Sequence, residues 1–442
     1  MWKSDNSGFS NNNQVEIYTK GKGYLYTINW SNVENDTIKG TEVDVKGNHT
    51  ITFPKPGIYK LEITGEFPQL FFPSNELRDN HKLISIEQWG DIKWRSFENS
   101  FYECINLRYN AHDQPILEEV SSFKQMFRGA LLFDGDISGW DVSSVKDMSA
   151  MFYRAYSFNQ DISDWNVGSV TDMSHLFHHA NLFNQPIGKW DVSNVSTMSF
   201  MFAGADSFNQ NLAEWNVSKV KHFSNMFTDA GLSHCHYDAL LNSWSKLDVK
   251  HGVIFNAGFS SYTTLSEHSR NHLVKKFGWS IYDGGQIEAL NMRAEVSKKD
   301  IILSISGGVG AYEFFWKGID FSSTQPQLIG AANGRYSVTV SDSDECVISE
   351  VFLLGASDQI NEGRSVMVYP NPVSETLFID NNELDTTLFE VFDTSGTLVL
   401  STQINEQKTR INLNKLNQGV YLYCVYDSNL SIHQTGKINI LR

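Results

Sequence analysis

The chain has 442 residues, of which 35 are Lys or Arg and 51 are Asp or Glu, so its formal net charge is −16. A nucleic-acid partner would favour a basic stripe and an anionic membrane would favour a basic helix, and the sequence contains neither. No stretch is long and apolar enough to cross a bilayer, and the length predicts about three domains.

Residues 1–82 form the first predicted domain. Short alternating apolar runs are separated there by Gly, Pro and Asn, which predicts a small antiparallel β domain. Residues 56–63, Pro-Gly-Ile-Tyr-Lys-Leu-Glu-Ile, resemble the last strands of PKD-like domains. The resemblance implies a domain that presents and caps the region after it.

A unit of 25 residues recurs between residues 134 and 230, and its most visible member is a Trp followed by Asp-Val or Asn-Val. A fixed period of this size is typical of solenoids. Apolar residues spaced by three or four between residues 145 and 155 predict a short helix, whereas alternation over residues 158–162 predicts a short strand. We therefore predict a multidomain fold. Its centre is an α/β solenoid of leucine-rich-repeat-like coils, each a short helix plus a short strand, which spans residues 83–285 with its caps and is flanked by all-β sandwich domains.

The motif Trp-Asp-Val-Ser-x-Val-x-x-Met-x-x-Met-Phe-x-x-Ala-x-x-Phe-Asn-Gln resembles the DUF285-like repeat of BspA-type leucine-rich-repeat surface proteins. The array departs from the pattern at its ends, where Pro115 takes the Trp position and Ser233 takes the strand Phe position. Terminal repeats are usually atypical because they cap an open hydrophobic end. The resemblance implies a surface protein with an adhesive role.

Two predicted segments follow the solenoid. Residues 286–355 contain alternating runs around a Gly-Gly-Val-Gly turn and resemble the immunoglobulin-like β domain of SprB-type gliding adhesins. Residues 356–365 have little apolar content, which predicts a flexible linker.

Residues 366–442 carry Tyr-Pro-Asn-Pro at residues 369–372 and continue as alternating strands separated by turns. They resemble the C-terminal sorting domain of the type IX secretion system of Bacteroidetes. The resemblance implies the type IX secretion machinery as a partner and a location outside the cell or on its outer surface. The chain opens with polar residues rather than with a signal peptide, so we expect a mature sequence. The sorting motif consists of Tyr369, Pro370, Asn371, Pro372, Gly419, Tyr421 and Lys437.

The repeated Trp and Asn residues are predicted to be structural. A Trp before Asp-Val can close each coil against its neighbour by burying a large area, although stacked aromatic side chains could also take sugar rings. An Asn after the strand Phe can form hydrogen bonds with backbone groups at a tight turn. These residues are Trp140, Trp165, Trp190 and Trp215, and Asn159, Asn184 and Asn209.

Variable positions of the predicted helix are the candidates for a binding face. His175 and His179 form an i, i+4 pair that could hold a metal on a helix. Other coils carry Ala150 and Arg154 at these positions, so we expect no metal site. The candidate binding residues are Arg128, Tyr153, Arg154, His178 and His179.

The polar residues give little support for ion binding or catalysis. Asp136, Asp161 and Asn211 recur at one position of the repeat, but Pro186 interrupts the row, which argues against a calcium ladder. No acidic pair lies in a local motif with a nucleophile or a general base, so we expect no catalytic residue, no cofactor and no enzyme activity.

The leading hypothesis is a secreted or cell-surface binding or adhesion protein that recognises a protein or glycan with a face of the solenoid. An exported solenoid enzyme acting on polysaccharide is the alternative. Such an enzyme would need coil insertions to build a cleft, and the strict register leaves no room for them between residues 134 and 230.

Overall fold

The computed structural model describes residues 1–74, 78–297, 299–318, 321–332, 334–354, 366–369, 373, 376–381, 386–393, 397–404, 406–427 and 432–440. The chain divides into two compact units, residues 1–287 and residues 288–442. Among the described residues, no helix has the length and apolarity that a membrane span requires.

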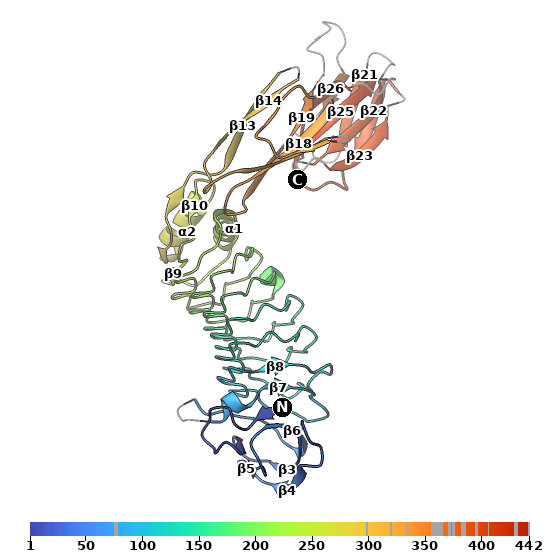
Figure 1. Cartoon of the computed structure of the whole chain (residues 1–442). Coiled ribbons are helices and arrows are strands. Elements are labelled where there is room, and N and C mark those ends of the chain that lie inside the picture. Colours follow the sequence, from blue (N-terminus) through green and yellow to red (C-terminus); the bar gives the residue numbers. More distant parts are fainter. Residues whose placement is uncertain are drawn as a thin grey trace. The chain divides into compact units, whose positions relative to one another are not determined.

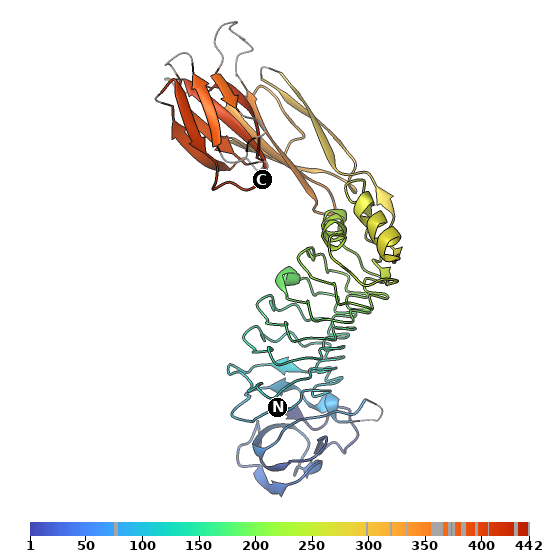
Figure 2. The ribbon, with the colours of Figure 1, turned by 180° about the vertical axis from the view of Figure 1, so that it is seen from behind.

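The first unit begins with a β region, drawn in blue in Figures 1 and 2. Its strands are β1 (Trp2–Lys3), β2 (Gln14–Ile17), β3 (Leu25–Asn32), β4 (Lys39–Val45), β5 (His49–Thr52) and β6 (Ile58–Glu66). One antiparallel sheet has the order β1-β6-β3-β4, and β2 pairs with β5. Buried and accessible residues alternate along β3, so Tyr26, Ile28 and Trp30 face the core.

Residues 97–230, which we call the coil stack, are built from turns that are joined by hydrogen bonds between successive coils (Figure 1). Within residues 148–154, every second backbone N–H donates to a carbonyl of the following coil. The intervening N–H groups of residues 151–155 donate to carbonyls three residues earlier in the same coil. Backbone polar groups are thereby satisfied without a long helix or strand. Single parallel bridges mark the register in a row through Ser122, Asp147, Asp172, Thr197 and His222.

The predicted α/β solenoid of helix-plus-strand coils is wrong. In the described coil stack, the only helical element is the 3-10 helix η2 (Ile187–Lys189), and residues 158–162 form no strand. The apolar spacing that predicted a helix comes from consecutive turns that begin at the buried Met148 and Phe152. Ala150 and Arg154 have φ values of 54° and 57°, which lie in the left-handed region that an α-helix excludes.

Short elements bound the coil stack at both ends. Before it, η1 (Asn80–Lys82) precedes β7 (Ser85–Ile86), which pairs in parallel with β8 (Arg108–Tyr109). After it come α1 (His234–Trp244), β9 (Ile254–Asn256), β10 (Tyr262–Thr263), α2 (Glu267–Phe277), β11 (Ser280–Tyr282) and β12 (Gln286–Ile287). The ring of Trp244 in α1 lies 5.3 Å from that of Phe223 in the last coil. One hydrophobic core therefore runs from Trp2 to Trp279.

The second unit contains two pairs of antiparallel sheets, each pair with its own hydrophobic core. These sheets fit the predicted β-sandwich domains, whereas the predicted linker at residues 356–365 lies outside the described residues. The first pair has the orders β13-β14-β17 and β16-β15-β18-β19, and the second has the orders β20-β21-β24 and β23-β22-β25-β26. The strands are β13 (Asn291–Val296), β14 (Ile301–Ser306), β15 (Glu313–Gly318), β16 (Phe321–Ser323), β17 (Gln327–Leu328), β18 (Gly334–Ser341), β19 (Val347–Leu354), β20 (Val366–Tyr369), β21 (Thr376–Asn381), β22 (Thr386–Phe392), β23 (Leu398–Gln403), β24 (Lys408–Asn412), β25 (Gly419–Asp427) and β26 (Ile432–Ile440).

Candidate binding face

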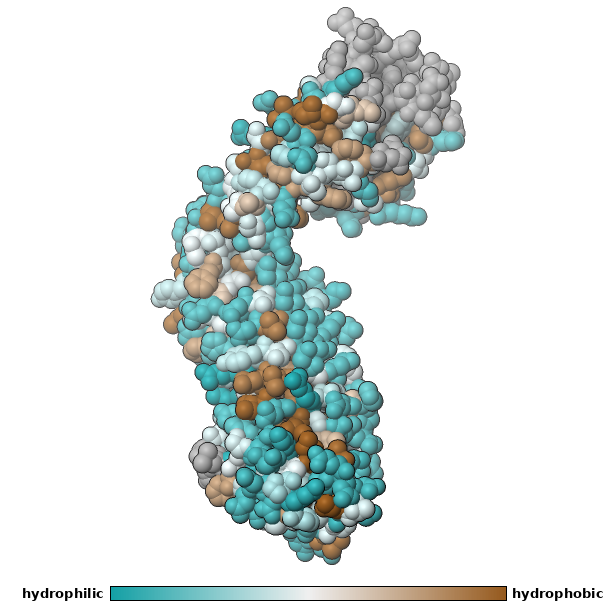
Figure 3. Space-filling view, in the orientation of Figure 1, coloured by the Kyte–Doolittle hydropathy of each residue, from teal (hydrophilic) through white to brown (hydrophobic). Residues whose placement is uncertain are grey.

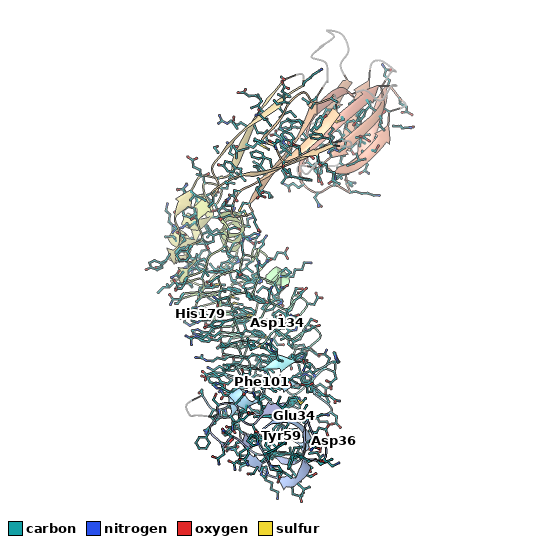
Figure 4. All side chains as sticks on the ribbon, viewed as in Figure 1. Glu34, Asp36, Tyr59, Phe101, Asp134 and His179 are labelled. Carbon is teal, nitrogen blue, oxygen red and sulfur yellow. The ribbon has the colours of Figure 1, made fainter. Side chains whose placement is uncertain are left out.

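The coil stack brings the five candidate binding residues together on one face. Arg128, Tyr153 and His178 each follow a buried Phe, so they form one column across three successive coils. Arg154 and His179 follow them in the next column, where both have positive φ values. Figure 4 labels His179 on this face. We call the complete set the aromatic-cation strip, and it consists of Tyr102, Arg128, Tyr153, Arg154, His175, His178, His179 and Phe200.

Cation–π contacts organise the arginine side of the strip. The guanidinium carbon of Arg128 lies 4.1 Å from the ring centroid of Tyr153 and 5.7 Å from that of Tyr102. The guanidinium carbon of Arg154 lies 5.6 Å from the Tyr153 centroid. Neither arginine forms a salt bridge within the described part of the chain. The ring of Tyr153 thus orients two positive charges that have no carboxylate partner there.

Stacked rings form the histidine side of the strip. Nδ1 of His175 lies 2.9 Å from Nδ1 of His178, and the His175 ring stacks on Phe200 at a centroid distance of 4.6 Å. Burial, then the neighbouring His179 and His175, and then Arg154 and Arg128 lower the pKa of His178 to about 4. Burial also lowers the pKa of His175. His178 is therefore neutral near pH 7, and the helix on which the metal alternative relied is not formed.

The repeated Trp side chains lie inside the coil stack. Trp140, Trp165, Trp190 and Trp215 are all buried. The indole Nε1–H of Trp190 donates to the Ile162 carbonyl at 3.1 Å, and Trp165 and Trp215 make the equivalent bond to the preceding coil. Nε1 of Trp140 has no hydrogen-bond partner among the described residues. The four rings leave little surface on which a sugar could stack.

The repeated Asn side chains form a hydrogen-bond ladder along the coil stack. Oδ1 of Asn159 accepts from the backbone N–H of Asn184, and Oδ1 of Asn184 accepts from that of Asn209, both at 2.9 Å. Asp134, labelled in Figure 4, is the first acceptor, and Ser233 is the last donor. Each Asn oxygen therefore satisfies a backbone donor of the following coil.

The row of Asp and Asn residues considered for calcium lies in local turns. Oδ1 of Asp136 accepts from the backbone N–H of Ser138, and Asp161 and Asn211 bind the residue two positions later in the same way. Hydrogen bonds from Ser138 lower the pKa of the Asp136 carboxyl.

The sorting motif is only partly described. Tyr369 ends β20, Gly419 and Tyr421 lie in β25, and Lys437 lies in β26. Pro370, Asn371 and Pro372 lie outside the described residues.

Sequence reasoning did not place three members of the strip, Tyr102, His175 and Phe200, on the binding face. Tyr102 lies in the incomplete first coil, one residue out of the 25-residue register, and Phe200 lies in the column of His175, which was considered only for metal binding. Comparing residues across the columns would have found all three. In Figure 3, the visible surface of the first unit is mostly hydrophilic and carries a few hydrophobic clusters.

Two family models match the chain. Residues 95–188 and 163–268 match the family described as "Mycoplasma protein of unknown function, DUF285", and residues 367–440 match "Secretion system C-terminal sorting domain". None of the curated proteins matches the chain.

Similar solved structures include the "Biofilm associated protein - BSP domain", which is 12% identical with a TM-score of 0.15 over 35% of this chain and 29% of that chain. The fibronectin(III)-like modules of Clostridium thermocellum CbhA are 16% identical with a TM-score of 0.14 over 35% of this chain and 93% of that chain. This chain thus spans less than a third of the length of the first structure. TM-scores this low carry no argument about fold or function.

Proposed function

We propose that this chain, a BspA-type surface protein with DUF285 repeats and a type IX secretion sorting domain, is a binding or adhesion protein. It is located outside the cell or on the outer cell surface, and its sorting domain implies export by the type IX secretion machinery. Both matched families are surface or secretion types rather than enzyme families, which supports a binding role and no catalytic one.

The aromatic-cation strip is the observation that carries the proposal. Arg128 and Arg154 keep their charge at any physiological pH, and a guanidinium can bind a carboxylate through two parallel hydrogen bonds. Because packing against Tyr153 already orients both side chains, they lose less conformational entropy when a ligand binds. The strip is therefore suited to an extracellular protein or glycan that carries an acidic group.

The proposed division of labour follows the domains expected from the sequence. In this proposal residues 83–285 present the strip, and residues 1–82 and 286–355 are supporting β domains. Residues 366–442 serve as the export signal, and residues 356–365 are the linker that precedes it. Expression of a chain that lacks residues 366–442, with a signal peptide, in a host with type IX secretion tests the last role. We expect a folded protein trapped in the periplasm, and its arrival at the surface would contradict the export role.

A binding screen of the full chain on glycan and matrix-protein panels tests the proposed function. A variant with Arg128→Ala and Arg154→Ala should lose about tenfold or more in affinity for any acidic ligand found, because it loses charge-assisted hydrogen bonds. A variant with Lys146→Ala and Lys189→Ala is the matched control, since it removes two exposed cations elsewhere in the coil stack. Equal losses in both variants would mean that net charge rather than the strip decides binding. Hydrolysis of a bound glycan in the same panel would favour the enzyme alternative.

A further inference from the structure

An open groove lies where β8 meets the coil that contains Asp134, which Figure 4 labels. Its volume is about 490 Å³, within the range of about 300–1,000 Å³ that is usual for ligand pockets. The lining comes from residues 84–85 at β7, residues 106–110 around β8 and residues 132–134 of the next coil. We call this cavity the polar groove.

Strand β7 separates β8 and the polar groove from the start of the chain. The Ser85 carbonyl accepts a hydrogen bond from the Met1 ammonium at 2.6 Å. The carbonyls of Ile84 and Ile86 instead accept from the backbone N–H groups of residues 108 and 110, both at 2.8 Å. Because carbonyls of successive residues point to opposite sides of a strand, Met1 and β8 lie on opposite edges of β7.

The polar groove lies where the sequence departs from the 25-residue repeat. In the later coils each ladder Asn is followed by a Gln, and Nε2 of Gln185 donates to the Asn159 carbonyl at 2.8 Å. Asp134 is instead followed by Gly135. A Cβ at Gly135 would collide with Cβ of Tyr109, so only Gly lets the two coils approach here. This coil therefore has no Gln side chain to cover the surface beside Asp134.

Two opposite charges line the polar groove. Arg108 and Asp134 each precede one member of the touching pair Tyr109 and Gly135, so they stand at equivalent positions of adjacent coils. Both are exposed, and neither forms a salt bridge within the described chain. Oδ1 of Asp134 accepts from the Asn159 N–H at 2.9 Å. The guanidinium and the second carboxylate oxygen are therefore available to a ligand.

Two amide side chains add acceptors with fixed positions. Nδ2 of Asn106 donates to the His81 carbonyl at 2.9 Å, and Nδ2 of Asn110 donates to Oε1 of Glu87 at 3.0 Å. The Ser85 hydroxyl also donates to Glu87 and holds that carboxylate in place. These bonds occupy the amide nitrogens, whereas Oδ1 of each Asn accepts no hydrogen bond from the described residues. Each Asn therefore offers an acceptor to a ligand hydroxyl.

An apolar wall lies beside these polar groups. Leu132 is 39% exposed, and Ile84 and Tyr109 are half-buried. The Tyr109 hydroxyl accepts from Nε1–H of Trp89 at 2.9 Å, and its ring lies edge-on to Phe133 at a centroid distance of 6.1 Å. The core thus fixes the Tyr109 ring before any ligand binds.

The charge pattern restricts the chemistry of the ligand. An anion would be attracted by Arg108 but repelled by Asp134, and a cation would meet the reverse. An apolar ligand would remove both charges from water without giving them a partner, which costs free energy. A neutral ligand with adjacent hydroxyls avoids these costs, because one hydroxyl can accept from the guanidinium while its neighbour donates to the carboxylate.

We propose that the polar groove binds one ring of a neutral sugar. Two adjacent hydroxyls lie between Arg108 and Asp134, a further hydroxyl donates to an Asn oxygen, and the C–H face of the ring packs on Leu132. The aromatic-cation strip, which we assigned to an acidic ligand, shares no residue with this groove. A sugar can therefore occupy the groove whether or not the strip binds its own ligand.

Saturation-transfer difference NMR with the full chain tests this assignment. The probes are methyl glycosides and disaccharides of glucose, galactose and mannose, and the control for each is its fully O-methylated form, which keeps the ring but has no hydroxyl donor. We expect weak, saturable binding of at least one probe and a loss of about tenfold or more on O-methylation. Absence of binding by every probe would overturn the assignment. Binding that ignores O-methylation would overturn it in favour of a general apolar contact.

Variants of the chain locate the sugar. Arg108→Ala should lose about tenfold or more in affinity, because it removes charge-assisted hydrogen bonds. Asp134→Asn keeps the ladder acceptor, as the Asn residues of later coils do, but replaces the carboxylate by a weaker amide partner and should lose several-fold. Asp161→Asn is the matched control, since it removes an exposed carboxylate outside the groove from a row that Asn211 also occupies, and it should bind normally. Urea denaturation should show all three variants folded.

Other occupants would give different results, and each would overturn the sugar assignment. Binding of glucuronate alone, abolished by Arg108→Ala and strengthened by Asp134→Asn, would indicate an acidic ligand. Binding of glycine without any sugar, weakened by both variants, would indicate a zwitterion. Sugar binding that neither variant changes would place the sugar elsewhere on the chain. Because the variant with Arg128→Ala and Arg154→Ala should keep sugar binding, failure of the groove and failure of the strip can be told apart.

Discussion

The coil stack and the β-sandwiches of the second unit satisfy the hydrogen-bonding groups of their backbones in different ways. In the sandwiches, long antiparallel pairs such as β18 and β19 keep one register over many residues. In the coil stack, single bridges and turns alternate, and half of the N–H groups in residues 148–155 bond to the neighbouring coil. The difference shows that a regular sequence period specifies stacking without specifying a helix or a strand.

The same difference explains why the strip lies in the coil stack. Equivalent positions of successive coils are brought side by side, so Arg128, Tyr153 and His178 become neighbours although 25 residues separate each from the next. In a sandwich, neighbouring side chains on one face come from alternate residues of one strand or from adjacent strands that share no sequence repeat. A column of a repeat can therefore build an extended binding face by changes at single positions.

The largest expected effect concerns the buried Trp residues. Trp190→Ala should cost about 3–5 kcal/mol of unfolding free energy, because it removes a large buried side chain and leaves the Ile162 carbonyl without its donor. Trp316 of the sandwich is the matched position, since it is also buried and also donates through Nε1 to a backbone carbonyl. Urea denaturation of Trp190→Ala and Trp316→Ala should give costs of similar size. A negligible cost for Trp190→Ala would contradict the buried placement.

A smaller effect is expected for the Asn ladder. Asn184→Ala removes the acceptor for the Asn209 N–H and for the Gln210 side chain, which should cost about 1–2 kcal/mol. Lys189→Ala, at an exposed position of the same coil whose side chain makes no hydrogen bond with the described residues, should change stability by at most about 0.5 kcal/mol. Thermal and urea denaturation check both. Equal small changes would make the Asn row a candidate contact surface rather than a structural ladder.

The pH dependence of stability tests the histidine side of the strip. The pKa of His178 falls from its usual 6.5 to about 4 in the folded chain. Between pH 4 and pH 6.5, His178 is therefore protonated in the unfolded chain but neutral in the folded chain. Stability should therefore be lost as the pH falls through that window, and should be unaffected by this group at higher pH. His178→Phe should lose less stability than the unaltered chain in urea denaturation across the window. A variant with an unchanged pH profile would mean that His178 titrates normally.

The sequence predicted some parts of the molecule well and others not at all. Alternation predicted the sandwich strands because a half-buried strand is the simplest source of that pattern. The spacing of Met148 and Phe152 was misread because four-residue turns and an α-helix place apolar residues at nearly the same intervals. Arg128, Tyr153 and His178 could be found as variable positions of the repeat. The cavity between β6 and residues 85–92 could not be found, because it combines β1, β6 and residues 85–101, which only the fold brings together.

The most direct test of the turn-built coil stack compares two variants at Arg154, an exposed position with φ of 57°. Both Arg154→Gly and Arg154→Ala remove the same contact with Tyr153, so their difference in stability reports the backbone alone. In the left-handed conformation Gly avoids a steric cost, so the Gly variant should be more stable than the Ala variant by about 1 kcal/mol in urea denaturation. In a helix the order would be reversed by about 1 kcal/mol. A more stable Ala variant would therefore contradict the turn-built coils and the geometry on which the strip rests.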